Sequence, residues 1–258
     1  MVVIMIDALK NNYKELDFIF LDEVNSTNTY CKEIGEGGFT KDTIVISDTQ
    51  TNGRGTKGRS WCSPKGKGLW FSMLLKPSIK IQDISFLTIL TSSALHNTFL
   101  SFGVNTKIKW PNDIYLNSKK LCGILTESKI TNKSVEYIIN GIGINVNLDL
   151  NDFSEELKKI ATSLFIATGK TFNREDILNK FIFNFYKYYN DFLNGNKGDI
   201  LEIYKNNSLI LNREVILQCK DKKRTVTPID ILDDGSLLIQ NLNNTLEKIV
   251  SGEISIRI

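Results

Sequence analysis

A glycine-rich, strongly basic segment, Gly53–Gly58, is the first feature of the sequence that could carry chemistry. Its glycines allow backbone N–H groups to converge, and five Lys and Arg side chains fall within residues 54–67. Converging N–H groups and clustered cations suit a phosphate or a carboxylate. A solvated basic loop without a ligand would have the same composition. Trp61, Trp70 and Phe71 favour the binding interpretation, because an indole in a polar loop indicates a stacking surface for a flat ligand.

The letters of this segment match G-x-G-x-x-G, but three nucleotide-binding motifs do not fit it. A dinucleotide-binding fold needs the motif directly before a helix, with an acidic residue about 20 positions later. Here the segment continues into Trp61, Pro64 and a strand. The H-R-D and D-F-G motifs of protein kinases are missing from the sequence, and so is the G-x-x-x-x-G-K-S/T of a P-loop. We therefore predict an anion-binding loop of another kind.

A second polar cluster, Lys109–Asp113, places a cation, an amide and a carboxylate at a strand end around a proline. Lys119 and Lys120 then lead into an apolar strand that contains Gly123. A lysine at the mouth of a buried strand is most often a surface charge. A glycine inside an apolar strand, however, indicates that a ligand approaches the backbone closely.

The composition of the 258 residues is that of an ordinary globular protein, with 41% hydrophobic and 24% charged residues. A net charge of +3 does not predict a nucleic-acid-binding protein, whose signature is a strong basic stripe. A single histidine, His96, excludes most zinc sites and most Ser-His-Asp arrangements. Four scattered cysteines indicate reduced thiols, and neither a signal peptide nor a spanning helix is found, so we expect a cytoplasmic protein without a membrane partner.

The periodicity of the apolar residues predicts an α+β fold. Strands are expected at residues 17–24, 43–47, 69–75, 107–110, 114–116, 122–127 and 137–146. A short helix follows residues 25–28, a longer one covers 83–102, and three more fall within 153–207. Short strands after residue 212, with a tight turn at Asp234-Gly235, predict a small β-barrel. We therefore expect a mixed-sheet domain of residues 1–211 and a C-terminal β-domain of residues 212–258.

Several blocks of sequence together resemble the biotin–protein ligase family, in that family's order and at similar spacing. They are STN (26–28), Gln50, GRGTKGRSW (53–61), KWPNDIYL (109–116), KKLCGIL (119–125), GIGINVN (141–147) and GEISIR (252–257). The resemblance covers the chain from about residue 18 to residue 147 and its last few residues. It is weak over the helical stretch 153–207.

The resemblance implies a mixed-sheet catalytic domain of the class II aminoacyl-tRNA synthetase type, with an SH3-like C-terminal β-barrel. It also implies two reaction steps. Biotin and ATP, with Mg²⁺, give biotinyl-5′-AMP and pyrophosphate, and a lysine of a biotin carboxyl carrier protein then attacks the mixed anhydride. A homodimer is implied as well.

The family's functional residues can be carried over onto matching positions of this sequence. Those implied to bind biotin are Ser26, Thr27, Asn28, Gln50, Gly53, Arg54, Gly55, Thr56, Lys120 and Gly123. Those implied to bind ATP are Arg54, Arg59, Trp61, Asn112, Lys120 and Asn145. Those implied to serve the chemistry are Lys120, Arg54 and Asp113, and the residues that ligate Mg²⁺ stay open.

Two departures from the family pattern bear on function. Thr56 stands where the family often has a basic residue, so the loop that should retain the adenylate has one charge fewer. Only about 20 residues precede the blocks, too few for the winged-helix domain of the repressor-type members, so we expect a monofunctional ligase that does not bind DNA. The alternatives are a lipoate or octanoate ligase or transferase of the same superfamily, and a non-catalytic binding module.

Overall fold

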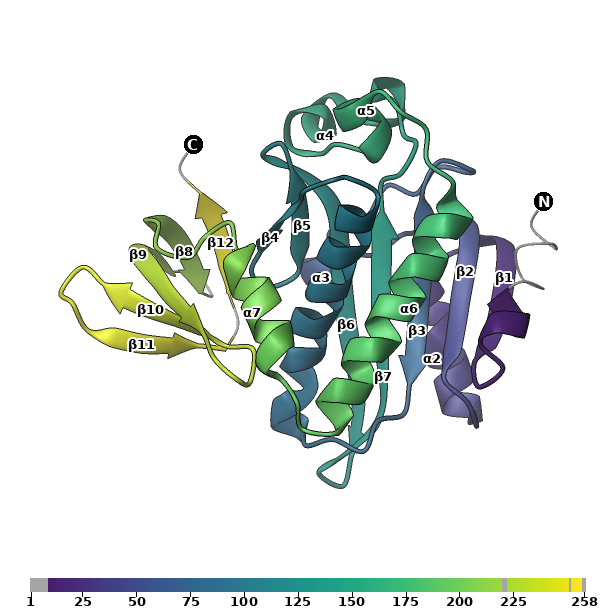
Figure 1. Cartoon of the computed structure of the whole chain (residues 1–258), viewed down its shortest axis with the longest axis horizontal. Coiled ribbons are helices and arrows are strands. Elements are labelled where there is room, and N and C mark those ends of the chain that lie inside the picture. The colour runs from purple at the N-terminus through teal and green to yellow at the C-terminus, as the bar shows by residue number, and fades with distance from the viewer. Residues whose placement is uncertain (1–8, 220–221, 251, 257–258) are drawn as a thin grey trace. The chain divides into compact units, whose positions relative to one another are not determined.

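The structure is a computed structural model that describes residues 9–219, 222–250 and 252–256 (Figure 1). Two compact units divide the chain. The first combines the residues up to Ile81 with Tyr115–Phe183, and the second combines Gln82–Ile114 with the residues from Asn184 onward. Compactness in the folded chain differs from independent folding, so the domains expected at 1–211 and 212–258 stay a prediction.

Seven strands form a mixed sheet. They are β1 (Asp17–Val24), β2 (Thr43–Gln50), β3 (Leu69–Leu75), β4 (Lys107–Lys109), β5 (Asp113–Leu116), β6 (Lys119–Thr131) and β7 (Ser134–Ile144). Their order in the sheet is β1-β2-β3-β7-β6-β5-β4. β1 pairs parallel with β2, whereas the β2–β3, β3–β7 and β7–β6 pairs are antiparallel. The expected α+β fold with a mixed sheet is confirmed.

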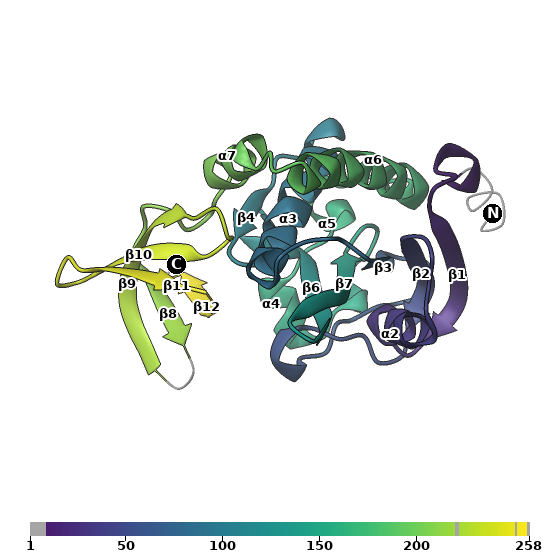
Figure 2. The same cartoon turned by 90° about the horizontal axis from the view of Figure 1, so that it is seen from below.

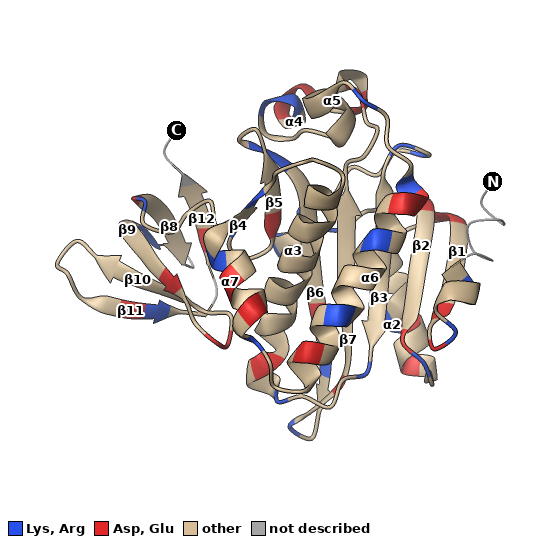
Figure 3. Ribbon diagram, in the orientation of Figure 1, with Lys and Arg blue, Asp and Glu red and all other residues tan. Residues whose placement is uncertain are grey.

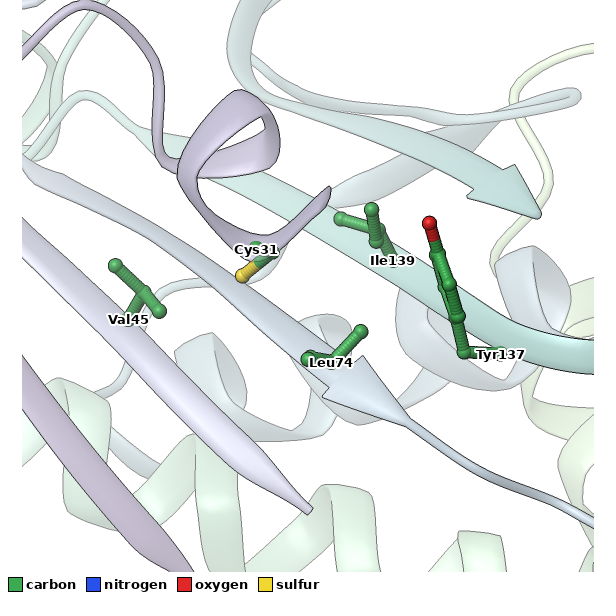
Figure 4. Close-up of a cluster of buried hydrophobic side chains, with 5 residues drawn as sticks. All are labelled: Cys31, Val45, Leu74, Tyr137 and Ile139. Atoms are coloured by element: carbon green, nitrogen blue, oxygen red, sulfur yellow. The ribbon is translucent and has the colours of Figure 1, made fainter. Parts of the chain in front are cut away.

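The helix α2 (Thr27–Gly37) covers one face of this sheet, and Figure 4 shows the core beneath it. Cys31 of α2 packs with four buried side chains of three strands: Val45, Leu74, Tyr137 and Ile139. A Cβ atom at Gly35 would lie 2.8 Å from the Tyr137 ring, so only glycine lets the helix approach this closely. The packing fixes the height of the first turn of α2 above β3 and β7.

Helix α6 (Arg174–Leu193) begins on the opposite face of the sheet (Figure 2). Phe181 in its first half meets Phe71 of β3, with ring centroids 5.4 Å apart. All seven residues of β3 are buried, as expected of a strand that is covered on both faces. Basic and acidic residues occur together on α6 (Figure 3). Within the described ranges, no helix combines the length and the hydropathy that crossing a membrane requires.

The second unit contains α3 (Ile84–Ser101), α7 (Gly198–Asn206) and a five-stranded antiparallel sheet of order β11-β10-β9-β8-β12. The strands of this sheet are β8 (Val215–Cys219), β9 (Lys222–Ile231), β10 (Leu237–Asn241), β11 (Leu246–Ile249) and β12 (Glu253–Ile256). Trp110, which is 2% exposed, donates its indole N–H to the carbonyl of Gly235 at 3.0 Å. The small C-terminal β-structure is therefore confirmed, and its β9–β10 turn packs on Trp110.

The structure corrects several details of the sequence-based elements. Residues 153–207 form four helices rather than three, because α4 (Glu155–Ile160) and α5 (Leu164–Thr168) are separate short helices. Ser154 and Ser163 cap their N-termini through their hydroxyl oxygens. β6 and β7 are longer than expected, since residues 132 and 133 form a tight turn with positive φ between them.

Candidate active site

The basic segment between β2 and β3 is a folded hairpin rather than an open loop. The backbone N–H of Gly55 donates to the carbonyl of Arg59 at 2.6 Å, and that of Trp61 donates to the carbonyl of Gly53 at 2.8 Å. A single 3₁₀ turn over Thr56–Gly58 forms the tip. These bonds fix the backbone from which the Arg54 and Arg59 side chains extend.

Gly53 is required at the base of this hairpin because a side chain at this position has no room. A Cβ atom there would lie 2.4 Å from the carbonyl oxygen of Trp61 and 2.9 Å from Ser63 Oγ. The first of these neighbours is backbone and cannot turn aside. A larger residue at position 53 would therefore displace the backbone at Trp61.

The first turn of α2 places three predicted biotin-binding residues below the surface. Ser26, Thr27 and Asn28 are each less than 5% exposed. The backbone N–H and the hydroxyl of Thr27 both donate to Gln50 Oε1, at 2.9 and 3.2 Å. Gln50 Nε2 in turn donates to Ser63 Oγ at 2.9 Å. The amide of Gln50 thus joins the helix start to the end of the basic hairpin.

Asn28 continues this hydrogen-bond network across the sheet. Its Nδ2 donates to the carbonyl of Leu125 at 3.2 Å and to Glu127 Oε2 at 2.7 Å. Its Oδ1 accepts from Ser72 Oγ at 2.6 Å, and Ser72 Oγ also lies 2.7 Å from Thr27 Oγ1. A Cβ atom at Gly141 would lie 2.0 Å from Asn28 Oδ1, so the glycine makes room for this amide. The Nδ2 and the Oδ1 of Asn28 therefore both have hydrogen-bond partners within the protein, which fixes the orientation of this amide.

Arg54 completes the network at its charged end. Its Nη2 donates to Glu127 Oε1 at 2.8 Å and its Nη1 to Glu127 Oε2 at 3.2 Å. The two side chains are 43% and 34% exposed. A continuous chain of polar contacts therefore runs from Gln50 to Arg54 through Thr27, Ser72, Asn28 and Glu127.

The indole of Trp61 lies across two glycines that face each other on β6 and β7. A Cβ atom at Gly143 would lie 2.4 Å from Trp61 Nε1, and one at its partner Gly123 would lie 2.9 Å from Cζ3 of the same ring. Lys120 Nζ lies 5.3 Å from the ring centroid, within range of a cation–π interaction. Gly123 was expected to admit a ligand, but the group that approaches it is Trp61. Trp61 Nε1 is buried and has no hydrogen-bond partner among the described residues.

The backbone of Lys120 is held by the segment 161–163, which connects α4 and α5 and is called the strap below. The carbonyl of Lys120 accepts from the N–H of Thr162 at 2.9 Å. Asn145, which is 3% exposed, donates its side-chain N–H to the carbonyl of Thr162 at 2.9 Å and its backbone N–H to that of Leu121. Asn145 therefore ties the end of β7 to the strap that positions Lys120.

Thr56 at the hairpin tip is bonded to Arg59. Arg59 Nη2 donates to Thr56 Oγ1 at 2.9 Å, and Arg59 Nε donates to the carbonyl of Thr56 at 3.3 Å. The hydroxyl of Thr56 is therefore an acceptor for the neighbouring Arg59 guanidinium.

The end of the basic segment is anchored by Lys67. Its Nζ contacts Asp149 Oδ2 at 2.8 Å and Asp152 Oδ2 at 2.9 Å. These bonds raise the pKa of Lys67, and the bond from Lys67 lowers the pKa of Asp149. Lys67 therefore ties the end of the basic segment to residues 149–152.

Asn112 and Asp113 belong to the second unit and follow a cis peptide bond between Trp110 and Pro111. The hydroxyl of the buried Tyr204 donates to the carbonyl of Pro111 at 3.3 Å. Burial, together with the negative charge of Asp113, raises the pKa of Tyr204 well above its ordinary value. The turn that carries Asn112 and Asp113 is thus fixed by contacts within its own unit.

Three site residues were not anticipated from the sequence: Ser72, Glu127 and Gly141. Gly141 lies in the recognised GIGINVN block, but its spacing alone does not show that it faces an amide. Ser72 lies within an apolar strand, where a lone serine is inconspicuous. Glu127 follows the KKLCGIL block by two residues and has the composition of an ordinary surface carboxylate.

Known proteins share both the sequence and the fold of this chain. Residues 20–145 match the model of the biotin/lipoate A/B protein ligase family. The bifunctional ligase/repressor BirA of Bacillus subtilis is 34% identical over 250 residues, which are 96% of this chain and 77% of that protein. This chain belongs to the biotin/lipoate A/B protein ligase family.

Two further members of the family add to the likeness. The biotin protein ligase of Aquifex aeolicus in complex with biotin and ATP has a TM-score of 0.81 at 31% identity, over 93% of this chain and 98% of that one. The biotin–[acetyl-CoA-carboxylase] ligase of Paracoccus denitrificans is 32% identical over 129 residues, 49% of this chain and 53% of that protein.

Proposed function

We propose that this chain is an ATP-dependent biotin–protein ligase, which forms biotinyl-5′-AMP and transfers biotin to a lysine of a carrier protein. The observation that carries the proposal is the polar network with two unlike ends. One end offers the neutral groups of Thr27, Asn28 and Gln50, and the other offers the guanidinium of Arg54. A ligand with a polar, uncharged head and an acidic tail matches such a site, and biotin has a ureido ring and a carboxylate.

In the first step the biotin carboxylate attacks the α-phosphate of ATP. A carboxylate–phosphate bond forms, the bond to the β-phosphate bridging oxygen breaks, and pyrophosphate leaves with the electron pair. Both reactants are anions, so charge is the main barrier, and fixed cations lower it where charge develops. Lys120 and Arg54 are assigned this role, with Gly53, Gly55 and Thr56 placed around the carboxylate.

At the neutral end we assign the biotin ring to Ser26, Thr27, Asn28 and Gln50, next to Gly123. Their burial supports the assignment, because a hydrogen bond to a ligand gains most where water is excluded. The amides of Asn28 and Gln50 are already oriented by protein partners. Orientation before binding lowers the entropy that the ligand must lose.

The nucleotide is assigned to Trp61, Arg59, Asn112 and Asn145, together with Arg54 and Lys120. An indole that is held flat on a glycine floor offers a stacking surface for adenine. Mg²⁺ enters as part of the substrate, bound to the phosphates of ATP. Among the described residues no group of three His, Cys, Asp or Glu side chains could hold a metal ion, which agrees with coordination mainly by phosphate and water.

In the second step the neutral amine of a carrier lysine attacks the acyl carbon of biotinyl-5′-AMP, and AMP leaves. We assign Asp113 to accept the proton of that amine. The partner is a biotin carboxyl carrier protein or domain, a substrate class that the name of the Paracoccus relative supports. Reduced thiols and the need for ATP support a cytoplasmic location, and a homodimer is proposed from the family alone.

Ligand-dependent pyrophosphate release tests this function. We expect release with ATP and biotin, and none with ATP and lipoate or octanoate. Release that depends on lipoate would instead favour the lipoate ligases of the same family. No release with either acid would favour a non-catalytic binding module.

A further inference from the structure

The carboxylate of Glu127 occupies a special place in the polar network, because both of its oxygens are bonded to side chains from other elements. Oε1 accepts from Arg54 Nη2, and Oε2 accepts from Arg54 Nη1 and from Asn28 Nδ2. Arg54 comes from the basic hairpin and Asn28 from the first turn of α2. Glu127 itself stands on β6, so one carboxylate connects three elements.

The geometry of the Arg54–Glu127 pair restricts rotation as well as distance. Two parallel N–H···O bonds between a guanidinium and a carboxylate hold both planes together, which a single ionic contact does not do. The remaining N–H groups of Arg54 then point in a fixed direction. An arginine that is 43% exposed would otherwise sample many rotamers.

Glu127 lies on the same strand, β6, as Lys120, the second cation assigned to the reaction. Lys120 is the second residue of the strand, Gly123 lies under Trp61, and Glu127 follows four residues later. β6 is paired along its length with β7 and makes a rigid base. Tying Arg54 to β6 therefore fixes it relative to Lys120.

We propose that Glu127 is a positioning residue of the ligase reaction. It orients the Arg54 guanidinium toward the reacting carboxylate and phosphate and holds the Asn28 amide at the ring end of the same ligand. The inference rests on the proposed function. Glu127 acts through Arg54 and makes no contact with the reacting atoms.

A double-mutant cycle with Glu127→Gln and Arg54→Lys separates this role from a structural one. Glu127→Gln keeps an acceptor oxygen for Asn28 but loses the two-bond pair with Arg54. Arg54→Lys keeps the charge at position 54 but loses the planar fork. Glu136→Gln is the matched control, because it removes an ion pair with Lys129 from the same β6–β7 hairpin. Single-turnover formation of biotinyl-5′-AMP is measured at saturating biotin and ATP, with a thermal melt of each variant.

We expect Glu127→Gln to slow adenylate formation by about tenfold in the wild-type background, since small misplacements of a catalytic group cost up to about 100-fold. In the Arg54→Lys background the same change should cost about twofold or less. Glu136→Gln should react at the wild-type rate. Melting temperatures of all variants should stay close to that of the wild type.

Three results would overturn the proposal. An equal loss in both backgrounds would show that Glu127 does not act through Arg54. A wild-type rate for Glu127→Gln would show that the pair has no part in the reaction, and a faster rate would show that Glu127 competes with the ligand for Arg54. If the wild-type protein forms no biotinyl-5′-AMP at all, the proposed function fails, which is a distinct outcome.

Discussion

The polar network of the first unit and the packing around Trp110 in the second unit use buried polar groups in opposite ways. In the network, hydrogen bonds link Thr27, Asn28 and Gln50 to other polar side chains. The chain of bonds ends at the exposed guanidinium of Arg54. In the second unit, single hydrogen bonds from buried polar groups join separate elements. The indole N–H of Trp110 donates to the carbonyl of Gly235 in the β9–β10 turn, and Ser93 Oγ of α3 donates to the carbonyl of Ile200 in α7 at 3.0 Å.

The contrast extends to the two tryptophans. The N–H of Trp110 has a partner at 3.0 Å, whereas that of Trp61 is buried and has none among the described residues. A buried donor without a partner costs stability, and such costs persist where function requires the group. Residues of the network should therefore affect activity more than stability, and residues around Trp110 should do the reverse.

The largest expected effect is on activity, from Lys120→Ala. The variant should form biotinyl-5′-AMP about 100-fold more slowly or worse, the scale of losing one preorganised charge contact. Its fold should be intact, because the side chain packs on Trp61 while its backbone keeps the bond to Thr162. Pyrophosphate release measures the loss of activity, and a thermal melt tests whether the fold is intact. An unchanged rate of release would show that the role is misassigned.

Trp110→Phe should lower stability most, because it leaves the buried carbonyl of Gly235 without its donor. The expected loss is about 1–3 kcal/mol of unfolding free energy, measured by urea denaturation. Trp61→Phe is the matched control, since its N–H has no partner among the described residues to lose, and it should change stability by less than about 0.5 kcal/mol. Equal losses in the two variants would remove the contrast between the two regions.

Thr56→Arg should slow the release of biotinyl-5′-AMP by about tenfold or more, because a charged hydrogen bond contributes about 1.5–3 kcal/mol. The wild-type protein should correspondingly release some adenylate, seen as biotin on lysines of unrelated proteins. Thr56→Val removes only the hydroxyl that accepts from Arg59, so it should not slow release. Stopped-flow fluorescence measures the off-rates. Equal rates for Thr56→Arg and the wild type would assign retention to Lys57 or to the backbone.

The smallest effect concerns pH and His96, which is 3% exposed and lies 3.0 Å from Thr106 Oγ1 through Nδ1. Burial, and then the charge of Lys107, lowers the pKa of His96 below its ordinary value of 6.5. As the pH falls, the unfolded chain binds the proton first, so stability should decline between about pH 7.5 and pH 5.5. His96→Gln should show a flatter profile in urea midpoints. An identical profile would mean that other groups set the pH dependence.

The sequence predicted the sheet because its strands depend on local patterns. The helix start after residues 25–28 and the apolar run of β3 are each visible in a few neighbouring letters. The fixed order of the blocks then pointed to the family, and the comparisons confirm it.

What escaped prediction depends on contacts between distant residues. Gly123 was expected to lie close to a ligand, and the contact of Trp61 with Gly123 follows only from the hairpin that carries Trp61 across β6. Glu127 gains its place because β6 runs beneath both Asn28 and Arg54, 99 and 73 residues away in sequence. Residues 153–207 hold four helices rather than three, because Ser163 caps a separate short helix α5 that ends at Gly169 in the left-handed conformation.

The most direct test of the central claim is mass spectrometry of a biotin-carrier domain after incubation with this protein, biotin and Mg-ATP. The account predicts one added biotinyl group, on one lysine of the carrier, that depends on both biotin and ATP. The Lys120→Ala variant should leave most of the carrier unmodified over the same time. A carrier whose lysines stay unmodified with the wild-type protein, while a known biotin–protein ligase modifies it, would contradict the account.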